Sequence, residues 1–352
     1  MNVPLRSLRS LPPEGAESVA WGGPARLTNR RPTLPALGYG GGSLFRVSEE
    51  REAADVLSYA YDRGFRYFDT APLYARGLGE HWFGTALRQR DRDDFILSTK
   101  VGRRLRPNCQ SPAPDDGLSF ELHYDYSHDG VLRALDDSLQ RLGLCRVDIV
   151  YIHDVNPRWQ GADYERRFGE AMRGAYPALE RLRSEGVVRA IGVGVKGADV
   201  CLRFAREGDF DLFMLAGGYT LLEHAALDEF LPHCAQHEIG IVVASPFNSG
   251  ILATGAVPGA RYFYEEAPPD IVERTRRLEA VCAQYGVPLG AAALQFTLAH
   301  PAVVSAVCGY RTTREVDTNL HWSTLQIPAA LWDALKVEKL IPEHAPVPSA
   351  RR

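Results

Sequence analysis

The chain alternates short apolar runs with amphipathic segments along almost its whole length, and this alternation limits the folds open to it. Regular alternation of strands and helices predicts a parallel sheet. Eight such units in one domain most simply form a (β/α)8 barrel, the TIM barrel, whereas the alternative, a doubly wound sheet, usually has fewer strands. The expected strands cover residues 34–40, 65–68, 95–99, 147–152, 189–193, 211–215, 241–243 and 303–307.

Capping residues and two long connections refine this α/β reading. Ser48 and Asp129 each precede a helical pattern and are expected to be N-caps. Residues 101–127 and 244–269 are too long for simple connections. Both follow strands, so we expect them on the C-terminal face, where such barrels carry their active sites. No change in composition divides the chain, which predicts one barrel domain over residues 31–345 after an N-terminal extension over 1–30.

Composition excludes several classes of function. Forty basic and 44 acidic side chains give a net charge of −4, which argues against nucleic acid or an anionic membrane as the main partner. No apolar run approaches the roughly 20 residues that span a bilayer, and the N-terminus has no apolar export segment. Six scattered cysteines favour a reduced, cytoplasmic protein. His233 and His237 lie four residues apart, but no third ligand accompanies them, so no metal site is expected.

Polar residues stand where the apolar runs end. Asp69 lies near the end of RYFDT, Lys100 ends FILSTK and His153 ends VDIVYIH, with Asp154 next. Tyr74 lies five residues after Asp69, in APLYA. Each of them alone could be a helix cap or a residue that seals the barrel rim. Because consecutive barrel strands are neighbours, however, all four side chains should converge in one sector of the rim.

The chemistry of these four residues is coherent. A tyrosine has a pKa of about 10, and a nearby ammonium lowers it by stabilising the phenolate. A carboxylate would hold that lysine charged, and a histidine could hydrogen-bond the oxygen of a substrate carbonyl. The group contains no nucleophile, metal cluster or electron sink. It therefore needs a hydride partner.

The motifs FDTAPLYARGLGEHWFG, STKVG and DIVYIHD resemble the aldo-keto reductases, with a match from about residue 34 to residue 340. The resemblance implies a (β/α)8 barrel that uses NAD or NADP on a small-molecule substrate. It makes Tyr74 the general acid/base, tuned by Lys100 and Asp69, and lets His153 orient the substrate.

Longer stretches resemble one branch of the family. They are HYDYSHDGVLRALDDSLQRLGLCRVDIVYIHD, STKVGRRLRP and PFNSGILATG. That branch contains the D-threo-aldose (L-fucose) 1-dehydrogenases and pyridoxal 4-dehydrogenase, which oxidise a sugar hemiacetal or an aldehyde-bearing alcohol. Two alternatives are a general reductase of aldehydes and ketones and a cofactor-binding regulatory barrel with little turnover.

The same resemblance implies where the cofactor lies. Glu315 would accept a ribose hydroxyl and repel a 2′-phosphate, which favours NAD, although Arg311 and Arg314 favour NADP. Many relatives have Ser-Asn at positions 194 and 195, and the related branch often has Asn at 196, so Lys196 leaves the carboxamide contact open. The cofactor-binding residues expected are Gly194, Lys196, Ser245, Pro246, Phe247, Asn248, Gly250, Gly309, Arg311, Glu315 and Asn319.

Three further features have more than one reading. Residues 192–197 match the pattern G-x-G-x-x-G. A Rossmann fingerprint also needs an acidic residue at the end of the next strand, but Asp211 lies at the start of its strand, so we reject a dinucleotide-binding fingerprint. The segment RRLR at 103–106 could bind an anion, although solvated charges on a loop are more common. The aromatic residues Tyr124, Tyr126 and Trp159 could form a pocket for a sugar ring or a pyridine, or only pack on the rim.

Overall fold

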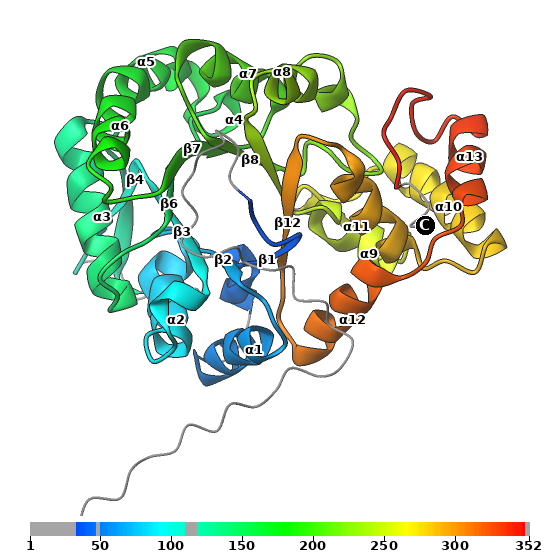
Figure 1. Ribbon diagram of the computed structural model, residues 1–352, viewed down its shortest axis with the longest axis horizontal. Helices are drawn as coiled ribbons and strands as arrows, with labels where there is room; N and C mark the ends of the chain where they lie inside the picture. Colours follow the sequence, from blue (N-terminus) through cyan, green and yellow to red (C-terminus); the bar gives the residue numbers. More distant parts are fainter. Residues whose placement is uncertain (1–32, 47–49, 110–117, 349–352) are drawn as a thin grey trace, which may run out of the picture.

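Eight parallel strands close into a barrel in the computed structural model, which describes residues 33–46, 50–109 and 118–348 (Figure 1). The order of neighbours around the barrel is β1, β12, β9, β8, β7, β6, β3 and β2. The predicted barrel is confirmed, and each expected strand overlaps an observed one. The strands are β1 Leu37–Gly40, β2 Tyr67–Asp69, β3 Ile96–Val101, β6 Ile149–His153, β7 Ala190–Val195, β8 Leu212–Ala216, β9 Gly240–Ala244 and β12 Val303–Gly309.

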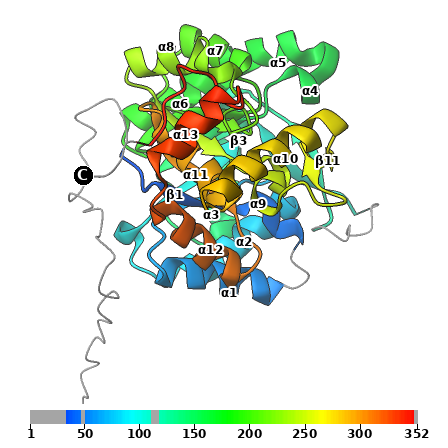
Figure 2. The same ribbon diagram turned by 90° about the vertical axis from the view of Figure 1, so that its right-hand side faces the viewer.

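Helices surround the barrel, and two of them, α10 and α13, pack together beside it (Figures 1 and 2). The longer helices are α1 Glu50–Asp62, α2 Leu78–Leu87, α3 His128–Leu142, α6 Tyr176–Ser184, α7 Ala198–Glu207, α10 Pro269–Gln284, α11 Leu289–Ala299, α12 Thr313–Thr324 and α13 Ala329–Val337. The short helices are α4 Pro157–Gln160, α5 Tyr164–Glu170, α8 Phe230–Gln236 and α9 Ile251–Thr254.

One predicted helix start is wrong. The N-cap of α3 is Ser127, whose Oγ accepts a hydrogen bond of 3.0 Å from the backbone N–H of Gly130. Asp129 lies inside the first turn, where its carboxylate still suits the positive end of the helix dipole. The cap predicted at Ser48 and the extension predicted over residues 1–30 lie outside the described residues.

Both long connections contain ordered hairpins, where the sequence suggested only loops. The connection after β3 forms an antiparallel pair, β4 Arg103–Pro107 with β5 Phe120–Tyr124. The connection after β9 forms a smaller pair, β10 Arg261–Tyr262 with β11 Glu265–Glu266. Each hairpin follows the C-terminal end of its strand, as the barrel prediction requires.

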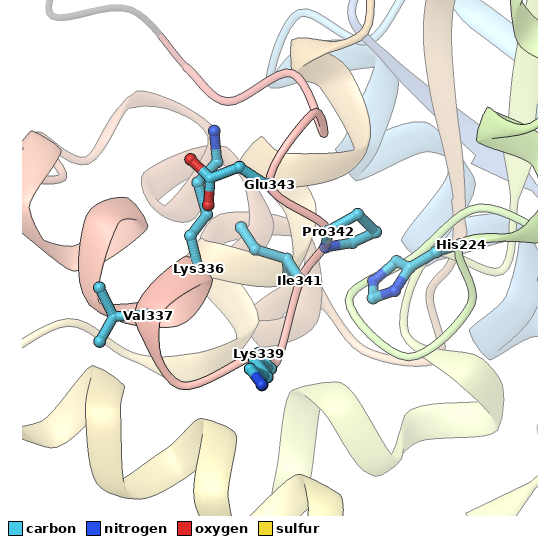
Figure 3. Close-up of a pocket in the computed structure, with 7 residues that line it drawn as sticks. All are labelled: His224, Lys336, Val337, Lys339, Ile341, Pro342 and Glu343. Atoms are coloured by element: carbon cyan, nitrogen blue, oxygen red, sulfur yellow. The ribbon is translucent and has the colours of Figure 1, made fainter.

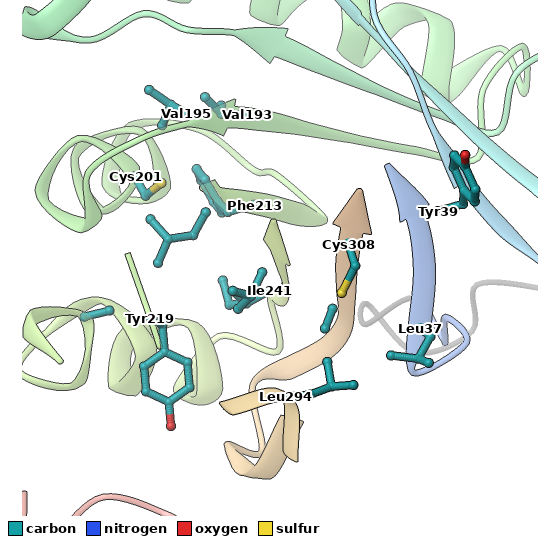
Figure 4. Packing of buried hydrophobic residues seen from close by; sticks show 14 of the residues in the cluster. Leu37, Tyr39, Val193, Val195, Cys201, Phe213, Tyr219, Ile241, Leu294 and Cys308 are labelled. Atoms are coloured by element: carbon teal, nitrogen blue, oxygen red, sulfur yellow. The ribbon is translucent and has the colours of Figure 1, made fainter. Parts of the chain in front are cut away.

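The apolar core has two parts, because successive side chains on a strand point to opposite faces. Side chains between the strands and the helices form the larger part, which includes Phe213, Ile241 and Leu294 (Figure 4). A second cluster fills the barrel interior and includes Tyr67 and Tyr151. Among the described helices, none combines the length and the apolarity needed to cross a bilayer.

Candidate active site

The two-residue period of three neighbouring strands brings polar side chains to one place inside the barrel. In β3, Ile96 packs in the interior cluster and Leu97 in the outer core, so Lys100 points inward. Asp69 at the end of β2 and His153 at the end of β6 follow the same alternation. Strand β3 pairs with both β2 and β6, so these three side chains lie at adjacent positions on one side of the barrel mouth.

Asp69 and Lys100 form a buried ion pair. The Lys100 Nζ lies 2.6 Å from Asp69 Oδ2 and donates a second hydrogen bond of 2.9 Å to the carbonyl of Thr70. The other carboxylate oxygen, Asp69 Oδ1, accepts 2.7 Å from Ser98 Oγ. Both charged side chains are only 2% exposed as residues. The pair is thus held on both sides and keeps the ammonium in one position.

Tyr74 reaches this pair from the loop after β2. It begins a short 3₁₀ turn, Tyr74–Gly77, that leads into α2. The Lys100 Nζ lies 4.6 Å from the centroid of the Tyr74 ring, and the His153 ring stands edge-on to it at 6.1 Å. Gly79 allows this approach, since a Cβ there would lie 2.9 Å from the Tyr74 carbonyl oxygen. All four residues expected to be catalytic therefore meet in one place.

The net shift in the pKa of Tyr74 is upward, whereas the sequence suggested that Lys100 would lower this pKa. Burial raises the pKa of Tyr74 to about 12, and it outweighs the Lys100 ammonium, which lowers this pKa. Asp69 also raises it, because its carboxylate disfavours a second negative charge nearby. The lysine thus limits an increase in the pKa of Tyr74 and does not produce a net decrease. At neutral pH this phenol is protonated.

Lys100 and His153 are set in opposite charge states. Burial is the largest single influence and would lower the pKa of Lys100, but Asp69 and Tyr74 together outweigh it, so the net shift is upward and the ammonium stays charged. Burial lowers the pKa of His153 well below its usual value, and the positive charges of Arg103 and Lys100 add to this effect. His153 is therefore neutral at physiological pH and can hydrogen-bond a substrate oxygen without adding charge.

An open turn follows β9, at the place expected to meet a pyrophosphate. Ser245 is exposed and has a φ of 56°, and Gly250, with a φ of 111°, caps α9. No heavy atom lies within 4 Å of a Cβ built on Gly250, so another molecule's phosphate could approach this backbone closely. Pro246 is buried, and the Phe247 ring contacts Trp322 edge-on at 5.9 Å. The turn fits a dinucleotide phosphate.

Asn248 has a different environment from its neighbours in this turn. It is buried, its Oδ1 accepts 2.5 Å from Thr220 Oγ1, and its Nδ2 donates 3.3 Å to the Gly217 carbonyl. These bonds tie the turn after β9 to the loop after β8. We propose a positioning role for Asn248, which holds the turn open.

The start of α12 carries the residues expected to meet the adenosine end. The Glu315 carboxylate accepts hydrogen bonds from the backbone N–H of Arg311 at 2.6 Å and from its Nη2 at 3.0 Å. Arg311 is exposed and its guanidinium is already paired, which weakens the argument that it binds a 2′-phosphate. Gly309 is exposed at the end of β12, whereas Asn319 is buried beside Cys308.

Gly194 and Lys196 lie at the end of β7. Gly194 pairs with His153, and a Cβ built there would lie 3.6 Å from Lys100 Cε, so this position borders the catalytic group. The Lys196 ammonium lies 3.0 Å from the ring centroid of Phe263, at the tip of the β10–β11 hairpin. Burial lowers the pKa of Lys196 to about 8. Phe263 could not be predicted from the sequence, because the contact joins residues 67 positions apart.

The three expected substrate-binding aromatics have different environments. Trp159 on α4 is 46% exposed, with the Arg103 guanidinium 6.0 Å from its ring centroid. Tyr124 is half-buried and stacks on Tyr126 at 6.3 Å. Tyr126 itself is 1% exposed, and its hydroxyl donates 2.7 Å to the His153 carbonyl. We therefore propose that Tyr126 positions His153 and does not face a substrate.

Two residues beside His153 were not selected from the sequence. Arg103 is buried and pairs with the Asp154 carboxylate, although the RRLR segment was read as a solvated loop. The sequence signal that could have indicated Asp154 and Arg103 is the position of Asp154 directly after a histidine at a strand end. A carboxylate that is buried there requires a cation nearby.

A surface hollow of about 390 Å³ lies away from this group, beside the C-terminal segment (Figure 3). It contains none of the residues expected to be catalytic. Val337, on its edge, is 80% exposed. Its lining is His224, Lys336, Val337, Lys339, Ile341, Pro342 and Glu343. Within the described residues, no cluster of three or more metal-ligating side chains is present.

Comparison with known proteins agrees with this geometry. Residues 36–337 match the sequence profile of the Aldo/keto reductase family. The chain is 42% identical to a D-threo-aldose 1-dehydrogenase of a Pseudomonas species and 37% identical to a pyridoxal 4-dehydrogenase of Microbacterium luteolum. Each match covers 88% of this chain and 95% of the relative. Among solved structures, an aldo-keto reductase of Bacillus halodurans in its holo form superposes with a TM-score of 0.69 at 25% identity, over 89% of this chain and 95% of that one.

Proposed function

This chain belongs to the aldo/keto reductase family, and from that premise we propose that it oxidises the cyclic hemiacetal of an aldose, or pyridoxal in its hemiacetal form, to a lactone. It is an NAD(P)-dependent oxidoreductase. The observation that carries the proposal is the joined group of Asp69, Lys100, Tyr74 and His153 at the barrel mouth. The names of the two relatives support the substrate class.

Four side chains of this protein have separate roles in the proposed reaction. Tyr74 takes the proton from the anomeric hydroxyl as the C–H bond at the anomeric carbon breaks. Lys100 stabilises the phenolate form of Tyr74, and Asp69 keeps this ammonium charged and in place. The neutral imidazole of His153 hydrogen-bonds the reacting oxygen. A bound nicotinamide supplies the hydride acceptor.

The exposed ring of Trp159 supports a sugar or pyridine substrate. The ring is 46% exposed, at a loop that follows the strand of His153, and an aromatic face of this kind can stack on the C–H groups of a sugar or on a pyridine ring. The six cysteines are free thiols, which supports a cytoplasmic location.

Initial rates of reduced-nicotinamide formation test the proposal directly. We would measure them with L-fucose, D-arabinose and pyridoxal, each with NAD and with NADP. A rate with one of these substrates supports the proposed dehydrogenase, and the substrate that reacts distinguishes an aldose dehydrogenase from a pyridoxal dehydrogenase. If none gives a rate while the protein reduces simple aldehydes, the general reductase replaces it.

We further propose that the enzyme prefers NAD, and that Glu315 sets the preference. Its carboxylate would repel a 2′-phosphate and also occupies the Arg311 guanidinium. Glu315→Gln removes the charge and frees Arg311, so we expect the ratio of kcat/KM for NAD to that for NADP to fall about tenfold, or ~1.4 kcal/mol. Glu338→Gln, which removes a carboxylate from the distant pair with Arg277, is the control. An unchanged ratio in Glu315→Gln would overturn the assignment.

The pH dependence of the two directions should differ. With a pKa near 12, Tyr74 is almost entirely protonated at neutral pH, so its base form becomes more abundant as the pH rises. We expect kcat/KM for oxidation to increase between pH 7 and 10, by up to about tenfold per pH unit. Aldehyde reduction needs the protonated phenol and should not increase over this range. An oxidation rate that is independent of pH would contradict Tyr74 as the base.

A further inference from the structure

The residue after His153 has an unusual backbone conformation. Asp154 has a φ of 51°, in the left-handed region that a non-glycine residue adopts only at a cost. This conformation turns its carboxylate back toward the preceding ring, with Asp154 Oδ2 3.5 Å from His153 Nε2. The backbone N–H of Asp154 donates 2.9 Å to the Gly194 carbonyl, which anchors the turn to the next strand.

Other loops hold this turn in place. Arg103, at the start of β4, pairs with the Asp154 carboxylate, and the two side chains are only 8% and 18% exposed. Tyr126 donates 2.7 Å to the His153 carbonyl, and Gln160 Nε2 donates 3.1 Å to the Asp154 carbonyl. The hairpin after β3 and helix α4 thus both act on the end of β6. None of these contacts is needed to close the barrel.

The hydrogen-bonding pattern of His153 favours one tautomer. Its Nδ1 is buried and has no hydrogen-bond partner among the described residues. A buried N–H without an acceptor is costly, whereas an unprotonated nitrogen there leaves no donor unsatisfied. The proton therefore belongs on Nε2, on the side of Asp154. At 3.5 Å this contact is longer than a hydrogen bond, so the Nε2–H can still donate to a substrate oxygen.

Without Arg103, the negative charge of Asp154 would favour the protonated form of His153. A carboxylate at this distance favours the imidazolium form and raises a histidine pKa by roughly 1–3 units. Arg103 offsets that charge at the same oxygen, Oδ2. The other groups facing the ring are the Lys100 ammonium on β3, which disfavours the imidazolium, and the phenol of Tyr74.

We propose that Asp154 and Arg103 act together as positioning residues: Asp154 fixes the orientation and tautomer of His153, and Arg103 keeps the ring neutral by cancelling the Asp154 charge. The proposed function makes this useful, because a neutral Nε2–H can hydrogen-bond the reacting oxygen without competing with Tyr74 for its proton.

Nitrogen-15 NMR of histidine-labelled protein tests the charge state without any substrate. The wild type, Arg103→Gln, Asp154→Asn and the double variant would be titrated from pH 5 to pH 9, with the His153 signal assigned by its loss in His153→Gln. Glutamine at 103 can still donate a hydrogen bond to Asp154, so the carboxylate keeps a partner. Thermal melts would establish that each variant is folded.

We expect only the single variant Arg103→Gln to give a His153 imidazole that becomes protonated within this range, with its pKa raised by about one unit or more. Asp154→Asn and the double variant should keep it neutral, as in the wild type. The double variant removes the Asp154 charge together with Arg103, so a neutral His153 in it shows that the effect of Arg103→Gln comes from the Asp154 charge. Identical His153 titrations and tautomer shifts in all four proteins would overturn the proposal.

Activity then separates this inference from the proposed function. If a substrate is found, Arg103→Gln should add a loss of kcat/KM at low pH that the double variant removes. A purely structural role would lower activity equally at all pH values. If no substrate is found, the NMR result still decides the role of Asp154 and Arg103, and only the proposed function fails.

Discussion

Replacing Tyr74 with phenylalanine is expected to lower kcat by about 10²- to 10⁴-fold, the contribution typical of a positioned general acid/base. The substitution removes one hydroxyl and keeps the ring that contacts Lys100 and His153. The expected loss therefore reports proton transfer and not repacking. Steady-state rates in both directions, with the preferred cofactor at saturation, measure it.

Cofactor binding provides the decisive comparison for Tyr74→Phe. Binding, measured by quenching of intrinsic fluorescence, should change little, because the expected cofactor contacts lie at the ends of β7, β9 and β12 and in the segments after them, and do not include Tyr74. Tyr285→Phe removes a tyrosine hydroxyl from a partly exposed residue after α10 and should leave kcat unchanged. Tight cofactor binding with no turnover in the wild type would instead favour the regulatory barrel.

The barrel could be predicted from the sequence because its signals are local. Eight apolar runs separated by helical patterns specify the strands, and a strand end is visible where a polar residue follows such a run. Asp69, Lys100 and His153 were therefore found from their positions alone, and Tyr74 from its loop beside them. Strand adjacency then predicted their convergence without any knowledge of distances.

The rest of the site depends on contacts between distant residues. The hydroxyl of Tyr126 reaches the backbone of His153, and Arg103 reaches Asp154, 51 residues away. Such pairs leave no periodic pattern in the sequence. The direction of the Tyr74 pKa shift could not be predicted from the sequence either. It depends on how far burial, which raises this pKa, outweighs the Lys100 charge, which lowers it.

Replacing Glu80 with glutamine is expected to destabilise the protein by about 3 kcal/mol, the lower end of the cost of breaking a buried ion pair. Glu80 on α2 is fully buried, and its carboxylate accepts 2.6 Å from Thr99 Oγ1 and 2.7 Å from Arg141 Nε. The glutamine has nearly the same shape but leaves the Arg141 guanidinium without the opposite charge of Glu80. Because Thr99 precedes Lys100 on β3, the loss also loosens the strand that carries the catalytic ammonium.

An exposed ion pair of the same composition gives a matched control. Glu185 accepts from Arg181 Nε at the same 2.7 Å, but both side chains are about half exposed. Water screens such a pair, so Glu185→Gln should cost only about 0.5 kcal/mol or less. Urea unfolding of both variants, followed by circular dichroism, measures the two free energies of unfolding. A difference of about 2.5 kcal/mol is expected from burial and from the Thr99 hydrogen bond that Glu185 lacks, since residue types and the ion-pair distance are the same. Equal costs would show that the buried Glu80 carboxylate does not stabilise the contact between α2, β3 and α3.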